Sequence, residues 1–325
     1  MSSKKGFVEI QFNWIFVLIS GAIILILFAG IILDQKNISQ VSTDVLIIKN
    51  LDAILSGSEV STGTVNVFTI PNTKIEFECD VYSIGEVSGQ FNMDVFAPSV
   101  LEGNSIISMT LGWNVPYKIS NLVYLTNPNI RYVFVGNSEF SRNIFNLIPD
   151  EAKKDIYNEI NEITNKNDGQ VIIVFFDQNP EFPENLNNNP VTALKVTGNE
   201  DKGTLEFFNS ENNKFVSRGT SYYLRGPTLL GAVFSDDLDN YDCVMENVFE
   251  KLNVVSQVYE RRSGSLMLKY KDQQCEQYYD PGSIKTIKEA SSTFSQSSIN
   301  IIDADAKNLE LQNKQAQLFS CHMIY

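Results

Sequence analysis

Two hydrophobic patterns follow one another at the N-terminal end of the chain. No charged residue occurs from Phe12 to Leu33, and about 20 apolar helical residues are enough to cross a hydrocarbon core about 30 Å thick. We therefore expect a transmembrane helix at residues 12–33. Beyond it, apolar residues recur every three or four positions, at Ile38, Val41, Val45, Ile48, Leu51 and Leu55. This spacing predicts an amphipathic stalk helix at residues 34–56 that continues the span and ends at Gly57.

The next segment, residues 57–127, alternates apolar and polar positions with the period of two that is typical of half-buried strands. Pairs such as Pro71-Asn72 and Gly103-Asn104 interrupt this pattern as turns. The expected strands are 64–70, 74–81, 91–96, 106–111 and 119–125. Residues 57–127 should form a mostly antiparallel sheet or a small sandwich.

Residues 128–262 have the pattern of an α/β unit. Two continuous apolar runs, 130–135 and 171–176, flank a stretch with isoleucines at helical spacing that begins near Pro149. Strand, helix and strand in this order predict a parallel crossover with both strands buried. A further apolar run, 229–234, is interpreted as a strand that leads into a helix at residues 238–260. We expect a small Rossmann-like core, interrupted by a surface loop at 181–190 and a hairpin region at 193–224.

The final segment, residues 263–325, predicts a strand at 266–270 and a long helix at 283–318. The expected fold class is therefore α+β. A basic segment (residues 1–11), the anchor and the stalk precede a head with a β-rich part (57–127), an α/β part (128–262) and a C-terminal part (263–325).

Charge sets the expected orientation of the anchor and limits the partners. Lys4 and Lys5 precede the span, so the positive-inside bias keeps the N-terminus in the cytoplasm and places the head outside. The predicted protein is thus a single-pass component of the cell membrane that contacts lipid through residues 12–33. The formal net charge of -14 repels phosphate backbones, so we expect no nucleic-acid partner.

The segment from Lys4 to Glu9, with the apolar helix directly behind it, resembles the class III signal of type IV pilins and archaeal pilin-like proteins. In that family a prepilin peptidase cleaves after the glycine, so the resemblance implies processing between Gly6 and Phe7. It also implies a helical rod under a globular head and self-association through the stalk. The glutamate that the family often has five residues after the cleavage site is Gln11 here, so the charge that sets subunit register in a filament is missing.

The four cysteines, Cys79, Cys243, Cys275 and Cys321, include no closely spaced pair. In a domain outside the cytoplasm an even number of cysteines indicates disulfides. A helix from Cys243 to about residue 261 rises about 27 Å, and an extended return to Cys275 recovers roughly 33 Å. This predicts the pairs Cys243–Cys275 and Cys79–Cys321. Asn37 opens the one N-x-S/T sequence of the chain and is a candidate glycosylation site.

The sequence contains few residues that could form a catalytic, metal or cofactor site. No glycine-rich phosphate loop follows the strand at 130–135, and we expect no cofactor. Asp236, Asp237 and Asp239 follow one predicted strand and Asp177 follows another, so their carboxylates could meet at one sheet edge and hold Mg²⁺ or Ca²⁺. Helix capping explains the first three equally well. Because His322 is the single histidine, a Ser-His-Asp site has only one possible base.

We therefore expect a non-enzymatic protein displayed on the cell surface, acting in adhesion, envelope structure or a pilin-like assembly. The alternative is a receptor or solute-binding ectodomain, which a deep apolar pocket with convergent polar groups would indicate. An enzyme with a carboxylate–metal site ranks below both.

Overall fold

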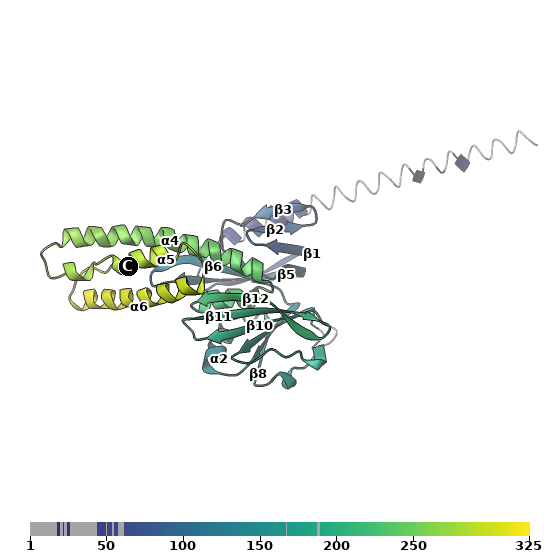
Figure 1. Ribbon diagram of the computed structural model, residues 1–325. Coiled ribbons are helices and arrows are strands. Elements are labelled where there is room, and N and C mark those ends of the chain that lie inside the picture. The colour runs from purple at the N-terminus through teal and green to yellow at the C-terminus, as the bar shows by residue number, and fades with distance from the viewer. Residues whose placement is uncertain are drawn as a thin grey trace, which may run out of the picture.

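Two six-stranded sheets and a group of C-terminal helices make up the head (Figure 1). This computed structural model describes residues 18, 19, 22, 25, 26, 44–49, 51–53, 55–57, 62–166, 168–186 and 189–325. The expected α+β class is confirmed. The larger hydrophobic core includes residues from both sheets and from the helices, while a smaller one lies on the other face of the second sheet.

The first sheet has the strand order β3-β2-β1-β5-β6-β4. Its strands are β1 (Val65–Glu78), β2 (Val81–Ile84), β3 (Val87–Gln90), β4 (Val95–Phe96), β5 (Val100–Asn114) and β6 (Lys118–Thr126). All pairings are antiparallel except that of β4 with β6. The two strands expected at 64–70 and 74–81 are largely one long strand, β1, whose pairing with β5 shifts register between Thr69 and Thr73. The expected antiparallel sheet is therefore present, with a bulge where the sequence predicted a turn.

The second sheet has the order β12-β11-β10-β9-β7-β8. Its strands are β7 (Ile130–Val135), β8 (Lys153–Tyr157), β9 (Gln170–Phe176), β10 (Val191–Gly198), β11 (Lys202–Glu211) and β12 (Lys214–Leu224). The four strands β8, β7, β9 and β10 are parallel, and β11 and β12 add an antiparallel hairpin. Strands β7 and β9 are buried, as expected. Loop residues such as Ile163 and Leu186, rather than a helix layer, cover the outer face, so the Rossmann-like resemblance extends to the parallel strands alone.

The crossover helix lies earlier than the sequence predicted. Helix α2 spans Glu139–Leu147 and begins at Ser138, whose hydroxyl accepts a hydrogen bond from the Ser141 backbone N–H at 3.1 Å. Residues 153–157, expected in the helix, form β8 because they pair in parallel with the edge of β7. The isoleucine spacing was misleading: Ile156 lies on β8 and Ile160 opens a short 3-10 turn, Ile160–Glu162.

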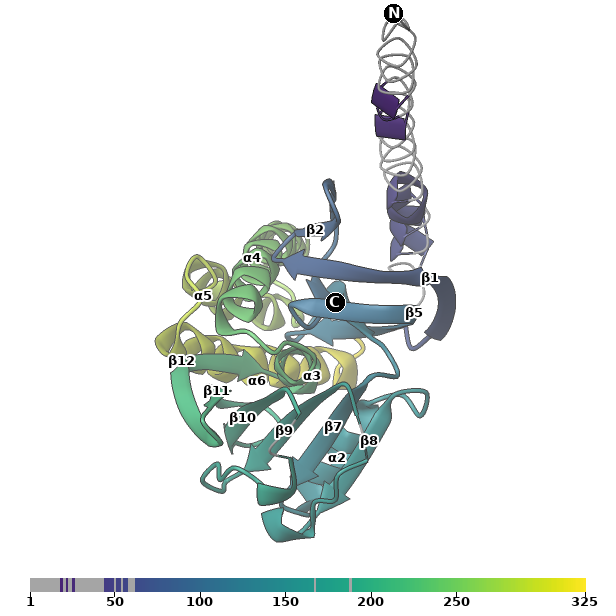
Figure 2. The ribbon, with the colours of Figure 1, turned by 90° about the vertical axis from the view of Figure 1, so that its right-hand side faces the viewer.

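The apolar run expected as a strand at 229–234 belongs to helix α3 (Gly226–Phe234). A short run of buried residues fits a strand or a buried helix equally, so periodicity alone cannot separate them. Pro227 in the first turn favours the helix. Figure 2 shows α3 between the two sheets, where every residue from Thr228 to Phe234 is buried. Gly231 permits this close approach, because a Cβ atom there would lie 2.8 Å from the Phe96 ring.

Three helices project from the sheets as an arm (Figure 1). They are α4 (Leu238–Lys269), α5 (Gly282–Ala290) and α6 (Gln296–Leu318). The strand expected at 266–270 is wrong, because those residues form the last turn of α4 and its C-terminal cap. The single helix expected at 283–318 is divided near Ser295, whose side chain caps the start of α6. The arm is therefore longer and more helical than the sequence predicted.

The described stalk residues 44–49, 51–53 and 55–57 are helical and lie against the first sheet. Four of their apolar side chains, Ile47, Ile48, Leu51 and Leu55, are at most 7% exposed and belong to the main core. The Tyr82 hydroxyl of β2 lies 2.5 Å from the Asp52 carboxylate and 3.3 Å from the Ile48 carbonyl oxygen. The head itself thus covers these four apolar residues of the described part of the stalk.

Most of the predicted anchor lies outside the described residues, as do Gly6, Phe7 and Asn37. Of residues 12–33, the structure describes Leu18, Ile19, Ala22, Leu25 and Ile26, all of them helical. Within the described part of the chain, no helix combines the length and apolar character needed to cross a membrane.

Candidate functional site

All four cysteines form disulfides, as expected, but the predicted pairs are wrong. Cys79 is bonded to Cys243 and Cys275 to Cys321, each with Cα atoms 5.7 Å apart. The first bond joins the end of β1 to the start of α4, and the second closes the outer end of the arm. Each therefore fixes a helix to a segment distant in sequence.

The length of α4 explains the wrong pairing. The prediction ended this helix near residue 261 and returned an extended strand to its start. Instead α4 has 32 residues and continues to Lys269, which makes it about 48 Å long. Cys275 follows its far end and cannot reach Cys243, whereas Cys79 at the end of β1 lies beside the first turns of α4.

The predicted carboxylate cluster stabilises the start of α4 and its contacts with the sheets. Asp237 is the N-cap, and its side chain accepts a hydrogen bond from the Asn240 backbone N–H at 3.0 Å. Asp236 accepts hydrogen bonds from the Ser99 backbone N–H and hydroxyl at 2.7 and 2.6 Å, and from the Gln170 amide at 2.7 Å. The hydrogen bond to Asp237 satisfies a free backbone N–H at the start of α4. Those to Asp236 link the two sheets.

Asp177 does not join this cluster. It follows the last residue of β9, whereas Gln170, the partner of Asp236, is the first residue of that strand. The two ends of a seven-residue strand are about 20 Å apart. Asp239 is exposed. Among the described residues, no three His, Cys, Asp or Glu side chains form a group that could hold a metal ion.

The pKa of one further acid near the start of α4 is shifted from its ordinary value. Burial raises the pKa of Asp242 to about 6, and the nearby carboxylates of Glu246 and Asp239 add to this effect, while a hydrogen bond from the Ser221 hydroxyl opposes it. The sequence does not indicate this burial, because it depends on β12 packing against α4.

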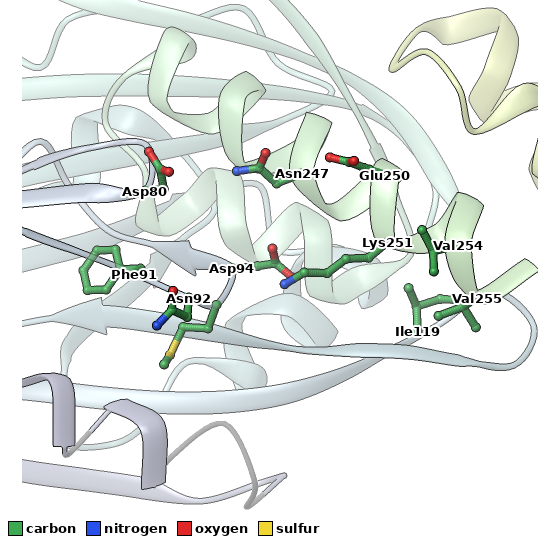
Figure 3. A pocket seen from close by; sticks show the side chains of 11 residues that line it. Asp80, Phe91, Asn92, Asp94, Ile119, Asn247, Glu250, Lys251, Val254 and Val255 are labelled. Carbon is green, nitrogen blue, oxygen red and sulfur yellow. The ribbon is translucent and has the colours of Figure 1, made fainter.

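A cleft lies between α4 and the first sheet (Figure 3). Its volume is about 450 Å³. On one side are residues 247–255 of α4, and on the other are the segment from Phe91 to Asp94 and Ile119 of β6. Both walls carry apolar side chains and acidic groups, so the cleft presents apolar surface and charged groups together.

An ion pair between a partly exposed lysine and a buried carboxylate lines this cleft. The Lys251 ammonium lies 2.9 Å from the Asp94 carboxylate, whose side chain is only 2% exposed. Asp80 at the rim accepts a hydrogen bond from Gln90 at 2.8 Å, and Glu250 stands on α4 facing the opening. Three carboxylates and one ammonium leave the cleft with a net negative charge, which suits a basic and partly apolar binding surface.

Two ion clusters built around buried charges were not predicted from the sequence. Arg131 of β7 is fully buried; its guanidinium donates hydrogen bonds to Asp155 at 2.6 Å, the Thr164 carbonyl at 2.7 Å and the Tyr157 hydroxyl at 3.0 Å. It also lies 3.4 Å from Asp168. The signal was a single arginine inside an otherwise apolar strand, since a buried guanidinium requires partners. This cluster joins β7 to β8 and to the loop beyond it.

The second cluster fixes α6 to the β11–β12 hairpin of the same sheet. Asp303 lies 2.7 Å from Arg225, 3.1 Å from Lys307 and 3.3 Å from Lys202. Burial by itself raises the pKa of Asp303, but the hydrogen bonds from these cations outweigh it and lower that pKa. Both clusters are internally paired and hold elements together.

Comparison of the chain with protein-family models, curated proteins and solved structures gave no match.

Proposed function

We propose that this chain is a membrane-anchored protein whose head lies outside the cytoplasm and acts there as a structural or interaction component of the cell surface. The observation that carries the proposal is the pairing of all four cysteines in two disulfides. Such bonds form and persist in oxidising compartments and are rare in the cytosol.

Two further observations support the anchored arrangement. The described helical residues Leu18, Ile19, Leu25 and Ile26 are 54 to 71% exposed, and lipid would cover this apolar surface. The stalk residues lie along an antiparallel sheet of the head, which is the arrangement that the pilin-like resemblance implies. The proposed protein therefore stands on a helical stalk whose upper part is built into the head.

Protease protection tests the topology. A tag is added before Met1 and an epitope after Tyr325, and protease is applied to intact cells or spheroplasts. We expect the C-terminal epitope to be digested and the N-terminal tag to be protected, because the head lies outside. Digestion of the tag with protection of the epitope would refute the proposal. Detergent lysis, after which both must be digested, is the control.

Measuring the intact mass of the protein distinguishes pilin-like cleavage after Gly6 from an uncleaved signal anchor. If the plan holds, the membrane-extracted protein lacks residues 1–6, because cleavage falls between Gly6 and Phe7. Replacing Gly6 with valine should then retain the full mass. A wild-type protein that keeps residues 1–6 would exclude pilin-like processing and leave the anchored head as the surviving part of the proposal.

A further inference from the structure

One face of α4 stays exposed along most of the helix. Every third or fourth residue, Glu246, Glu250, Val254, Val258, Arg261, Ser265 and Leu268, lies on this face, which we call the α4 stripe. Val254 is 56% exposed, Val258 61% and Leu268 77%. Elsewhere along α4, the apolar residues Val244, Val248 and Leu252 are buried against the sheets. The stripe is therefore an unpartnered surface in the middle of a long, well-packed helix.

The charges along the stripe are segregated. Glu246 and Glu250 lie before the two valines, and Arg261 lies after them. From residue 261 to residue 271 the chain has four basic residues and no acid, although its net charge is -14. Glu250 and Arg261 make no ion pair with another described residue, whereas the neighbouring Glu260 is paired with Lys288 at 2.5 Å. The stripe thus runs from acidic through apolar to basic.

We propose that the α4 stripe is a self-association surface on which a second copy of this chain binds in the antiparallel direction. Reversing the helix about a two-fold axis at the level of Ser256 places Val254 opposite Val258, and Arg261 of the second copy within one residue, about 1.5 Å along the helix, of the level of Glu250. The arginine then lies at the opening of the acidic cleft, beside Glu250 (Figure 3). One register pairs both the valines and the charges.

Charge complementarity identifies the second copy as the occupant. A two-fold interface needs a surface that matches itself after reversal, and a sequence that runs from acid to base has this property. A parallel arrangement would set Glu250 against Glu250 and Arg261 against Arg261, and like charges at an interface are unfavourable. The exposed valines supply the apolar centre.

The N-to-C direction of α4 relative to the stalk determines where the two stalks lie in the dimer. The disulfide to Cys79 places the start of α4 next to β2, which contacts the stalk, and the arm extends the other way (Figure 1). An antiparallel pair therefore has its two stalks at opposite ends. For a chain anchored as proposed above, this joins proteins in two facing membranes. The pairing itself does not depend on anchoring, so it is tested in detergent.

The test uses the full-length protein in detergent micelles, with its mass measured by light scattering and sedimentation over a range of concentrations. We expect a monomer–dimer equilibrium. Glu250→Arg and Arg261→Glu should each weaken the dimer about tenfold or more, since each change creates two repulsive contacts per dimer. The double variant E250R/R261E should restore it. Lys214→Glu, a charge reversal at the exposed first residue of β12, is the matched control.

Cross-linking tests the register independently. A cysteine at Gln257 lies next to the two-fold axis, displaced from its symmetry mate by about 3 Å along the helix direction. The corresponding displacement for a cysteine at Ser265 is about 27 Å. Oxidation should join Q257C chains and leave S265C chains apart. A wild-type monomer at every concentration up to roughly 100 µM, single reversals without effect, a double reversal that fails to restore the dimer, or equal cross-linking at both positions would each overturn the proposal.

Discussion

Truncation of Leu51 should show how firmly the stalk is built into the head. Leu51 is 2% exposed in the core that it shares with the first sheet. Leu51→Ala removes three carbon groups worth about 0.8 kcal/mol each, and the remaining cavity raises the loss to about 3 kcal/mol. Leu46 on the same helical segment is 58% exposed, so Leu46→Ala should change the free energy of unfolding by less than about 0.5 kcal/mol.

Urea unfolding of the full chain in mild detergent measures both variants. Trp113 of β5 is fully buried and its indole N–H donates to the Leu224 carbonyl of the other sheet at 2.9 Å, so its fluorescence follows the whole head. Trp14 is replaced by phenylalanine to remove its background. With a slope of about 3 kcal/mol/M, Leu51→Ala should lower the midpoint by about 1 M urea. Equal midpoints for Leu51→Ala and Leu46→Ala would refute the seating of the stalk on the sheet.

Three further predictions concern the covalent and ionic links. Opening the Cys79–Cys243 bond, which closes a 164-residue separation, should lower stability by about 5 kcal/mol in the chain-entropy model, and non-reducing peptide mapping should recover this pair in the wild type. Arg131→Met leaves the buried Asp168 without its guanidinium and should cost about 3–5 kcal/mol in urea unfolding, against about 0–1 for Arg218→Met, whose ion pair is half exposed. Burial raises the pKa of Asp242 to about 6, above its unfolded value near 3.9. The folded state then holds more protons, so wild-type stability should fall as pH rises from about 4 to about 6, and Asp242→Asn should remove that fall.

The elements with a local signature could be predicted from the sequence. Strands β7 and β9 appeared as apolar runs at nearly their observed bounds, and the start of α4 followed from the acids that cap it. Helix α3 could not be predicted in this way, because its burial between two sheets makes residues 229–234 continuously apolar and removes the periodic signal. Tertiary packing, rather than a local pattern, determines that element.

The same division applies to the candidate sites. That the cysteines form disulfides followed from their number, but their pairing depended on whether α4 ends near residue 261 or at Lys269. Helix ends are among the least certain features of a sequence pattern. The cleft beside α4 depends on how a strand segment and a helix far apart in sequence come together, and no motif marks it. The acid-to-base order of the α4 stripe was visible in the sequence, but its meaning required knowing which face is exposed.

The bond between Cys79 and Cys243 also determines how the chain carries a pulling force. Tension applied between the stalk and any point beyond Cys243 passes through the two sulfur atoms, because residues 80–242 form a covalently closed loop. The whole second sheet lies inside this loop, so it bears none of the load. Without the bond, a 164-residue separation could extend by roughly 550 Å at about 3.4 Å per residue. The oxidised chain is therefore a short, inextensible tether between stalk and arm, with a folded sheet suspended beside the line of force.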